Sequence, residues 1–297
     1  MVPGPTKVCR CWSQRCVLPS EWWISCGNSN VSQSPERFAI DGGLLAGHDG
    51  DGRWNNLGYW RHANNYSDAC AALARLHGRV AGLSENHSVL ELACGYGAGL
   101  DLWRQEFAVG SVLGLEYRQH CVEVINDARV IHGRFDMPFP ESLGRGFVDA
   151  VVCVDAAYHA RSLTAFLSNI FPVLKANGRL VFSTLVRSEG NTSFWSRQRN
   201  RMLLRLASMP DASVLPINTL QETLNQQGFD ASFEDVSEDV FSGFSQWVRY
   251  REQQLLPDQR RSPAWLKIRF TARWCEALAA DRSLRYMMVS ATKRAPV

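Results

Sequence analysis

A glycine-rich turn joins a short apolar run to a helical pattern in the first half of the chain. Residues 88–99 read SVLELACGYGAG, and the helical pattern LDLWRQEF follows at once. A second apolar run, SVLGLEY, reaches the acid Glu116 twenty-one residues beyond Gly95. A strand, a glycine turn, a helix and an acid that ends the next strand are typical of a nucleoside-binding βαβ unit. Glycine lets the backbone pass beneath a ligand that a Cβ atom would strike.

The spacing within the turn separates the classes of nucleotide site. A dinucleotide site of the G-x-G-x-x-G kind requires glycine or alanine at position 100, where this chain has Leu100, and the turn lacks the Lys-Ser/Thr pair of a phosphate loop. The order acid-x-x-x-Gly-x-Gly, formed by Glu91, Gly95 and Gly97, resembles the first motif of class I S-adenosylmethionine (SAM) dependent methyltransferases. Ala93 stands where that family often has glycine, which is a mild departure.

The segments that follow the turn come in the order that this resemblance implies. They are a helical pattern (HCVEVINDA), a short third strand with its loop (RVIHGRFDMPFP), a fourth strand (FVDAVVCVDAAYH), and a helix with a fifth strand (LTAFLSNIFPVLKANGRLVFSTL). Gly178 of the Asn177-Gly178 pair is expected to end that helix in the left-handed conformation. VLKANGRLVFS is similar to the family's L-K-P-G-G-x-L signature. Strands that alternate with helices also favour a parallel sheet covered on both faces.

We therefore expect an α/β protein with the Rossmann-like class I methyltransferase fold. The predicted sheet has seven mostly parallel strands flanked by helices, with an N-terminal helical lid and helical inserts after strands 5 and 6. The expected organisation is a disordered tail over 1–37, the lid over 38–86, a SAM-binding core over 87–189, and acceptor-binding inserts with the final strands over 190–297.

Composition and cysteine placement exclude several classes of protein. The net charge of +3 is too small to indicate a nucleic-acid partner, and no apolar run approaches the 18 residues of a membrane span. The cysteines of the first 35 residues lack partners at zinc spacing, so no metal is expected, and no signal peptide is apparent. The other cysteines are interpreted as buried thiols of a reducing cytoplasm. The four early cysteines are Cys9, Cys11, Cys16 and Cys26.

Basic residues gather in two clusters in the second half of the chain. Each cluster is either a solvated helix face or an attraction for an anionic acceptor such as a carboxylate or a prenyl diphosphate. The first comprises Arg187, Arg197, Arg199, Arg201 and Arg205, and the second Arg249, Arg251, Arg260, Arg261, Lys267, Arg269 and Arg273.

The resemblance implies a set of residues around SAM. Glu116 is expected to hold the ribose with Tyr117 against the adenine, while the glycine turn brings backbone atoms close to the methionine part. Asp136 is the counterpart of the family's adenine-facing acid, although Arg134 occupies the customary place of that acid. The complete predicted set is Glu91, Ala93, Gly95, Gly97, Glu116, Tyr117, Asp136, Met137 and Asp155.

Methyl transfer requires alignment of the acceptor with SAM and, for many acceptors, removal of a proton. His159 follows the fourth predicted strand, at the edge of an open α/β sheet where ligands bind, and an unperturbed histidine can accept a proton at neutral pH. We predict His159 as the base, with Tyr158 beside it either as a partner or as a ring against the sulfonium. The alternative is a histidine that caps the next helix; His120 and His132 are interpreted as structural.

Aromatic residues at both ends of the core indicate an acceptor site. Asn56-Leu57-Gly58-Tyr59-Trp60 resembles the N-x-G-Y-W element of small-molecule methyltransferases, in which the aromatic ring covers the cofactor or lines the acceptor pocket. Tyr59 either does this, as a catalytic or acceptor-binding residue, or docks the first helix. Further aromatic residues are either core or acceptor-binding. The acceptor candidates are Tyr59, Trp195, Phe244 and Trp247.

The predicted function is SAM-dependent O- or C-methylation of a largely apolar or planar small molecule in secondary metabolism. The sequence leaves open whether this acceptor carries an anionic group. One alternative is C-methylation of a prenyl diphosphate or other isoprenoid held by arginines. Another is a SAM-fold protein that binds without catalysis. Base methylation in nucleic acids is disfavoured because the segment from Asp155 to Tyr158 lacks the prolines of the N/D-P-P-Y/F tetrad. A homodimer is compatible with the sequence.

Overall fold

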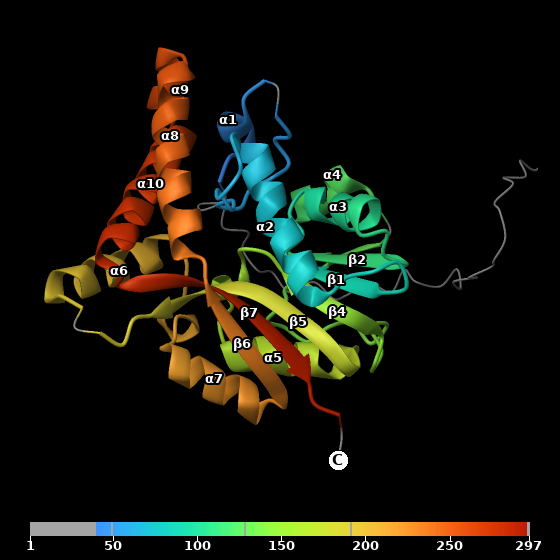
Figure 1. Cartoon of the computed structure of the whole chain (residues 1–297). Helices are drawn as coiled ribbons and strands as arrows, with labels where there is room; N and C mark the ends of the chain where they lie inside the picture. Colours follow the sequence, from blue (N-terminus) through green and yellow to red (C-terminus); the bar gives the residue numbers. More distant parts are fainter. Residues whose placement is uncertain (1–39, 49, 128, 191, 296–297) are drawn as a thin grey trace, which may run out of the picture. The chain divides into compact units, whose positions relative to one another are not determined.

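The computed structural model describes residues 40–48, 50–127, 129–190 and 192–295 (Figure 1). The tail expected over 1–37 lies outside the described residues. Within them the strands form one seven-stranded sheet in the order β3-β2-β1-β4-β5-β7-β6. Strands β1 to β5 pair in parallel, whereas β7 runs antiparallel to both β5 and β6. The strands are β1 (Ser88–Leu92), β2 (Ser111–Glu116), β3 (Val130–His132), β4 (Val148–Cys153), β5 (Leu174–Arg187), β6 (Phe229–Asp235) and β7 (Leu284–Lys293).

Helices cover both faces of the sheet, as predicted. Alternate residues of a strand point to opposite faces, so Val152 of β4 packs in one hydrophobic cluster and Val151 and Cys153 in the other. Helices α2 and α3 supply the first cluster, and α5 and α7 the second (Figure 1). The helices are α1 (Gly42–Ala46), α2 (Tyr66–Ala81), α3 (Ala98–Glu106), α4 (Gln119–Ile125), α5 (Leu163–Val173), α6 (Phe194–Leu206), α7 (Ile217–Gln226), α8 (Gly243–Gln254), α9 (Pro257–Arg261) and α10 (Pro263–Asp281), with the short turns η1 (Ala157–His159), η2 (Asp211–Ser213) and η3 (Glu238–Ser242).

The predicted end of the helix before the fifth strand is wrong. Helix α5 ends at Val173, and β5 begins at once with Leu174. The carbonyl of Val173 accepts the backbone N–H of Phe147 at 2.8 Å, which commits the chain to the sheet before the Asn-Gly pair is reached. Asn177, not Gly178, has the left-handed conformation, with φ of 60°.

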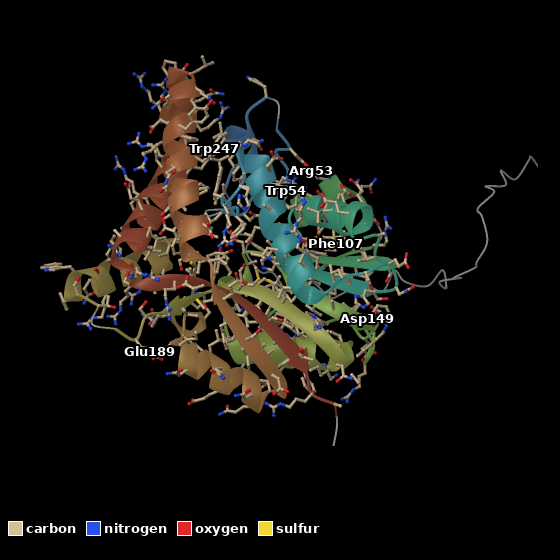
Figure 2. The ribbon with its side chains drawn as sticks, viewed as in Figure 1. Arg53, Trp54, Phe107, Asp149, Glu189 and Trp247 are labelled. Carbon is tan, nitrogen blue, oxygen red and sulfur yellow. The ribbon has the colours of Figure 1, made fainter. Side chains whose placement is uncertain are left out.

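An extended stretch before α2 connects the sheet to the insert that follows β6. We call residues 50–65 the N-terminal segment. The backbone N–H of Trp60 donates to the carbonyl of Asp239 at 3.0 Å, and the rings of Trp60 and Trp247 lie 5.6 Å apart. Figure 2 labels Trp247 where α8 faces this part of the chain. Among the described residues of the predicted lid, only α1 and α2 are helical, so most of the N-terminal segment is held by contacts rather than by helix.

Gly243, the first residue of α8, lies directly against Trp60. A Cβ atom at position 243 would overlap the Cβ of Trp60, which cannot swing away as the end of a long side chain could. We expect Gly243→Ala to lower the free energy of unfolding by about 2 kcal/mol, since overpacking displaces neighbouring backbone. Urea unfolding measures this loss, with the exposed Gln246→Ala as the control in the same helix. Equal stability of the two variants would contradict the close packing.

Candidate active site

The glycine turn follows β1 and begins α3 in the conformation that its sequence requires. Gly95 and Gly97 have φ of 60° and 81°, values that side chains disfavour. Ala93 also has a positive φ, 56°, which explains why glycine is common at this position in similar sequences. Because β1 and β2 are parallel neighbours, their carboxyl ends meet, and the backbone N–H of Gly95 donates to Glu116 Oε2 at 2.8 Å.

Glu116 lies at the end of β2 with only 1% of its surface exposed. Its Oε1 atom accepts the backbone N–H and the Nε of Arg118, both at 2.9 Å. The guanidinium of Arg118 also lies over the Tyr96 ring, 5.6 Å from its centroid. A buried carboxylate fixed beside a glycine cradle fits the ribose of a nucleoside cofactor. Sequence reasoning missed Arg118, because nothing in its spacing distinguishes it from an ordinary helix-start residue.

Glu91 points beneath the first turn of α3. Its Oε2 atom accepts the indole N–H of Trp103 at 2.8 Å. A Cβ atom at Gly99 would overlap the Glu91 carboxylate, so the third glycine of the turn makes room for this acid. Burial raises the pKa of Glu91 to about 8, and the charge of Glu116 adds to the increase. The geometry supports the prediction that Glu91 orients the turn, through α3.

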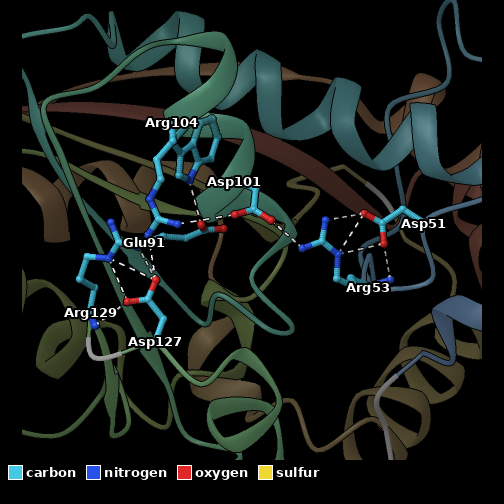
Figure 3. Close-up of polar contacts among 8 residues, drawn as sticks. Asp51, Arg53, Glu91, Asp101, Arg104, Asp127 and Arg129 are labelled. Atoms are coloured by element: carbon cyan, nitrogen blue, oxygen red, sulfur yellow. Dashed lines mark hydrogen bonds and ion pairs between the residues drawn. The ribbon is translucent and has the colours of Figure 1, made fainter. Parts of the chain in front are cut away.

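Ion pairs continue from this turn to the N-terminal segment (Figure 3). Arg104 of α3 lies 3.5 Å from both Asp101 and Asp127. Arg53 pairs with Asp101 at 2.6 Å and also with Asp51. Each exposed pair contributes under about 1 kcal/mol, so the network positions the segment beside α3 more than it stabilises the fold.

Glu91 gives the stability of the protein an unusual dependence on pH. The carboxyl of Glu91 has a pKa of 4.5 when it is unperturbed, as in the unfolded chain, and of about 8 in the folded protein. Between these pH values the folded protein therefore binds more protons than the unfolded chain does. Stability contributed by the protonated acid is therefore lost as pH rises from 4.5 to 8. We expect Glu91→Gln to remove a decline on the order of 4 kcal/mol over this window. Urea unfolding at pH 5 and pH 8.5 measures the decline, and the exposed Glu85→Gln should leave it intact.

The loop after β3 places the predicted adenine-side residues among arginines. Asp136 accepts hydrogen bonds from the Arg134 side chain at 2.9 and 3.0 Å and from the backbone N–H of Arg161 at 2.8 Å. Burial raises the pKa of Asp136, but these hydrogen bonds outweigh it and hold the pKa below its usual value. Tyr117 is half exposed with Arg134 over its ring, and Met137 is also exposed. Contact between Asp136 and adenine stays a prediction.

Asp155 connects three parts of the fold beyond the end of β4. Its Oδ1 atom accepts the hydroxyls of Tyr158 and Tyr286, each at 2.6 Å, and its Oδ2 atom accepts the backbone N–H of Leu57 at 2.7 Å. Burial raises the pKa of Asp155 to about 6, against the effect of these hydrogen bonds. This link could not be predicted from sequence, since Tyr286 lies far from Asp155 along the chain.

His159 and Tyr158 lie at the edge of the sheet that also carries the glycine turn, because β1 and β4 are paired neighbours. Their rings are 4.7 Å apart. Burial lowers the pKa of His159 to about 4, despite a hydrogen bond to the backbone of Ser208. The imidazole is therefore neutral at neutral pH, as a proton acceptor must be. The Tyr158 hydroxyl is directed to Asp155 rather than left free.

The predicted acceptor residues occupy four different environments. Tyr59 is partly buried with Arg61 over its ring, and Trp247 donates its indole N–H to the Leu45 carbonyl at 3.2 Å. Phe244 is fully buried in the core, whereas Trp195 of α6 is 79% exposed. The structure thus brings Trp247 to the N-terminal segment and leaves Trp195 on the surface.

A parallel sheet closed by one antiparallel strand, a glycine turn after β1 and a buried acid at the end of β2 define a class I SAM-dependent methyltransferase. SAM is the cofactor, and its contacts with Gly95, Gly97 and Glu116 stay a prediction. The profile of the methyltransferase domain family matches residues 59–232, and the chain belongs to that family. It is an enzyme of the small-molecule type.

Similar proteins methylate or otherwise modify small molecules. Erythromycin 3''-O-methyltransferase of Saccharopolyspora erythraea is 24% identical over 217 residues, covering 67% of this chain and 70% of its own. The structure of a mycolic acid cyclopropane synthase complexed with S-adenosylhomocysteine superposes with a TM-score of 0.65 at 17% identity, covering 80% and 89% of the two chains. The structure of geranyl diphosphate methyltransferase in complex with geranyl diphosphate and sinefungin superposes with a TM-score of 0.59 at 15% identity, covering 77% of this chain and 80% of the other.

The described residues contain neither a candidate membrane span nor a candidate metal cluster. Across 40–48, 50–127, 129–190 and 192–295, no helix has the length and apolar character needed to cross a membrane. The same residues contain no group of three or more His, Cys, Asp or Glu side chains suited to a metal ion.

Proposed function

We propose that this methyltransferase transfers the SAM methyl group to a hydroxyl of a largely apolar small molecule. The observation that carries the proposal is His159, a neutral imidazole at the same sheet edge as the glycine turn. Bound SAM supplies an electrophilic methyl group on a sulfonium. An oxygen nucleophile must lose a proton as the carbon–oxygen bond forms, and the electron pair of the broken carbon–sulfur bond would stay with sulfur.

The residues of this chain have separate tasks in that reaction. Gly95 and Gly97 bring backbone atoms close to the methionine part of the cofactor, and Glu116 holds its ribose. The N-terminal segment, fixed to Asp155 through Leu57, covers the site and excludes water. A ring nitrogen of His159 accepts the proton. A histidine whose pKa is about 4 is a weak base toward a free alcohol, but it suffices once methylation has begun to make that oxygen strongly acidic.

Four of the twelve residues in the two basic clusters are already paired with acids, so these four are not free to hold a prenyl diphosphate. A diphosphate requires cations that are free to contact it. In the described residues, members of both basic clusters already face acids. The pairs are Arg187–Asp211 at 2.7 Å, Arg199–Asp281 at 2.8 Å, Arg249–Glu276 at 2.6 Å and Arg269–Glu252 at 3.2 Å.

Mass spectrometry of products formed with SAM tests the proposal. The purified protein is incubated with hydroxylated macrolides, hydroxylated aromatic compounds and geranyl diphosphate, and each product is checked for one added methyl group. We expect transfer to a hydroxyl of an apolar compound, located by fragmentation. Methylation of geranyl diphosphate at carbon alone would replace the proposal by its alternative. Absence of SAM binding by calorimetry would overturn the enzymatic interpretation altogether.

A further inference from the structure

Helix α6 exposes apolar side chains on the surface turned away from the sheet. Trp195 is 79% exposed, Phe194 57%, Met202 53% and Leu206 49%. Large apolar side chains concentrated on one short helix are uncommon on a protein surface and mark interaction sites. We call the exposed side of α6, residues 194–206, the α6 face.

The opposite side of α6 is fixed to the rest of the protein. Asn200 is buried, donates its amide to Ser283 Oγ at 2.7 Å, and accepts the indole N–H of Trp274 at 3.3 Å. Leu203 and Leu204 are buried on the same side. Helix α6 lies beside the C-terminal part of α10 in Figure 1, consistent with these contacts. Because the buried side is anchored, the α6 face stays directed outward.

Apolar and basic side chains form two neighbouring stripes on the α6 face. At 3.6 residues per turn, Trp195, Met202 and Leu206 align along one stripe. Basic side chains align along the other, and the two stripes flank the outward direction of the helix. The basic stripe comprises Arg197, Arg201 and Arg205.

The basic stripe is not neutralised within the described part of the protein. Arg199 pairs with Asp281, but Arg197, Arg201 and Arg205 have no carboxylate within ion-pair distance among the described residues. The sequence from Thr192 to Pro210 contains no aspartate or glutamate. The α6 face therefore combines exposed apolar area with unpaired positive charge, and its partner must be apolar and negatively charged.

We propose that the α6 face binds the surface of a membrane that contains anionic lipids. Arginines beside exposed tryptophan, phenylalanine and leucine have the composition of a helix that lies in the lipid interface. The helix of 13 residues, about 20 Å long, would lie parallel to the surface with Trp195 and Met202 among the acyl chains and its arginines at the lipid phosphates. A second copy of this chain fits less well, because a two-fold interface would oppose the same arginines.

Sedimentation with sucrose-loaded vesicles tests this binding on the full-length protein. One set of vesicles contains phosphatidylcholine alone, and the other adds phosphatidylglycerol. We expect sedimentation with the anionic vesicles only, declining as salt is raised. Trp195→Ala should lower the partitioning of the protein onto anionic vesicles about ten-fold, because the variant lacks the indole ring whose burial in the lipid favours binding. Replacing Arg197, Arg201 and Arg205 together by glutamine should lower vesicle partitioning about a hundred-fold, because each lost positive charge lowers it about five-fold.

Matched controls change equally exposed residues on other elements. Leu256→Ala removes an exposed apolar side chain, and glutamine at Arg145, Arg261 and Arg273 removes three exposed arginines. These variants should sediment like the unaltered protein, and all variants should bind SAM equally by calorimetry without vesicles. That measurement separates failure of this inference from failure of the proposed function.

Three results would overturn the proposal. The first is absence of sedimentation with anionic vesicles at low salt, and the second is sedimentation that the α6 variants leave unchanged. The third is that the unaltered protein is a dimer in solution and the α6 variants are monomers that bind vesicles as well as the unaltered protein does. That result would assign the α6 face to a subunit interface.

Discussion

Glu116→Gln is expected to lower the affinity for SAM about a hundred-fold or more. The buried carboxylate accepts the backbone N–H of Gly95, and we propose that it also accepts the hydroxyls of the ribose. Hydrogen bonds to a charged acceptor contribute about 1.5–3 kcal/mol each, and glutamine has one acceptor oxygen in place of two. Isothermal titration calorimetry with SAM measures the loss.

A matched variant separates binding from folding in this experiment. Glu123→Gln removes an exposed acid on the neighbouring α4 and should bind SAM normally. Thermal unfolding of Glu116→Gln is measured in parallel, because the variant leaves Arg118 without its charged partner. A folded Glu116→Gln protein that binds SAM as tightly as the unaltered one would show that the ribose is held elsewhere.

His159→Ala should lower kcat by about 100- to 10,000-fold while leaving SAM affinity unchanged. This range is typical for the loss of a positioned proton acceptor. Single-turnover measurements with the acceptor identified by mass spectrometry give the rate of the chemical step. The variant also removes a ring that packs on Tyr158, so His159→Gln, which keeps a polar side chain of similar reach, serves as the second variant.

The outcome distinguishes a catalytic role from a structural one. His62→Ala, at an exposed position on the N-terminal segment, should retain full activity. If His159→Ala and His159→Gln both turn over normally at saturating acceptor, the imidazole is not the base. A rise in KM without a change in kcat would instead indicate that His159 orients the acceptor.

The sheet could be predicted because its signals are local. Short stretches of sequence contain all the signals: the apolar runs, the glycine turn and the acid that ends β2. Each strand can also be placed from the pairing with its neighbour. The end of α5 was mispredicted for the same reason. The favourable stop at Asn177 lies nearby in sequence, but the carbonyl of Val173 is taken by Phe147 from a distant loop.

The relative location of the candidate site residues could be predicted only where a residue's position at the end of a strand implies its place in the fold. The residues after β1, β2 and β4 meet at one sheet edge, so Gly95, Glu116 and His159 could be assigned together. The aromatic residues of the inserts could not, because helical spacing is the same for buried Phe244 and exposed Trp195. The partners of Asp155 come from opposite ends of the chain, and no spacing rule relates them.

The N-terminal segment has contacts on both sides that restrict how this enzyme can diversify. It is hydrogen-bonded to Asp155 at the cofactor edge and to Asp239 at the start of the insert that carries α8. We propose that a substitution in the insert that admits a different acceptor would shift the segment and change how it covers SAM. Acceptor preference and cofactor affinity would then be coupled, and natural or laboratory changes in one should be accompanied by compensating changes near Trp60.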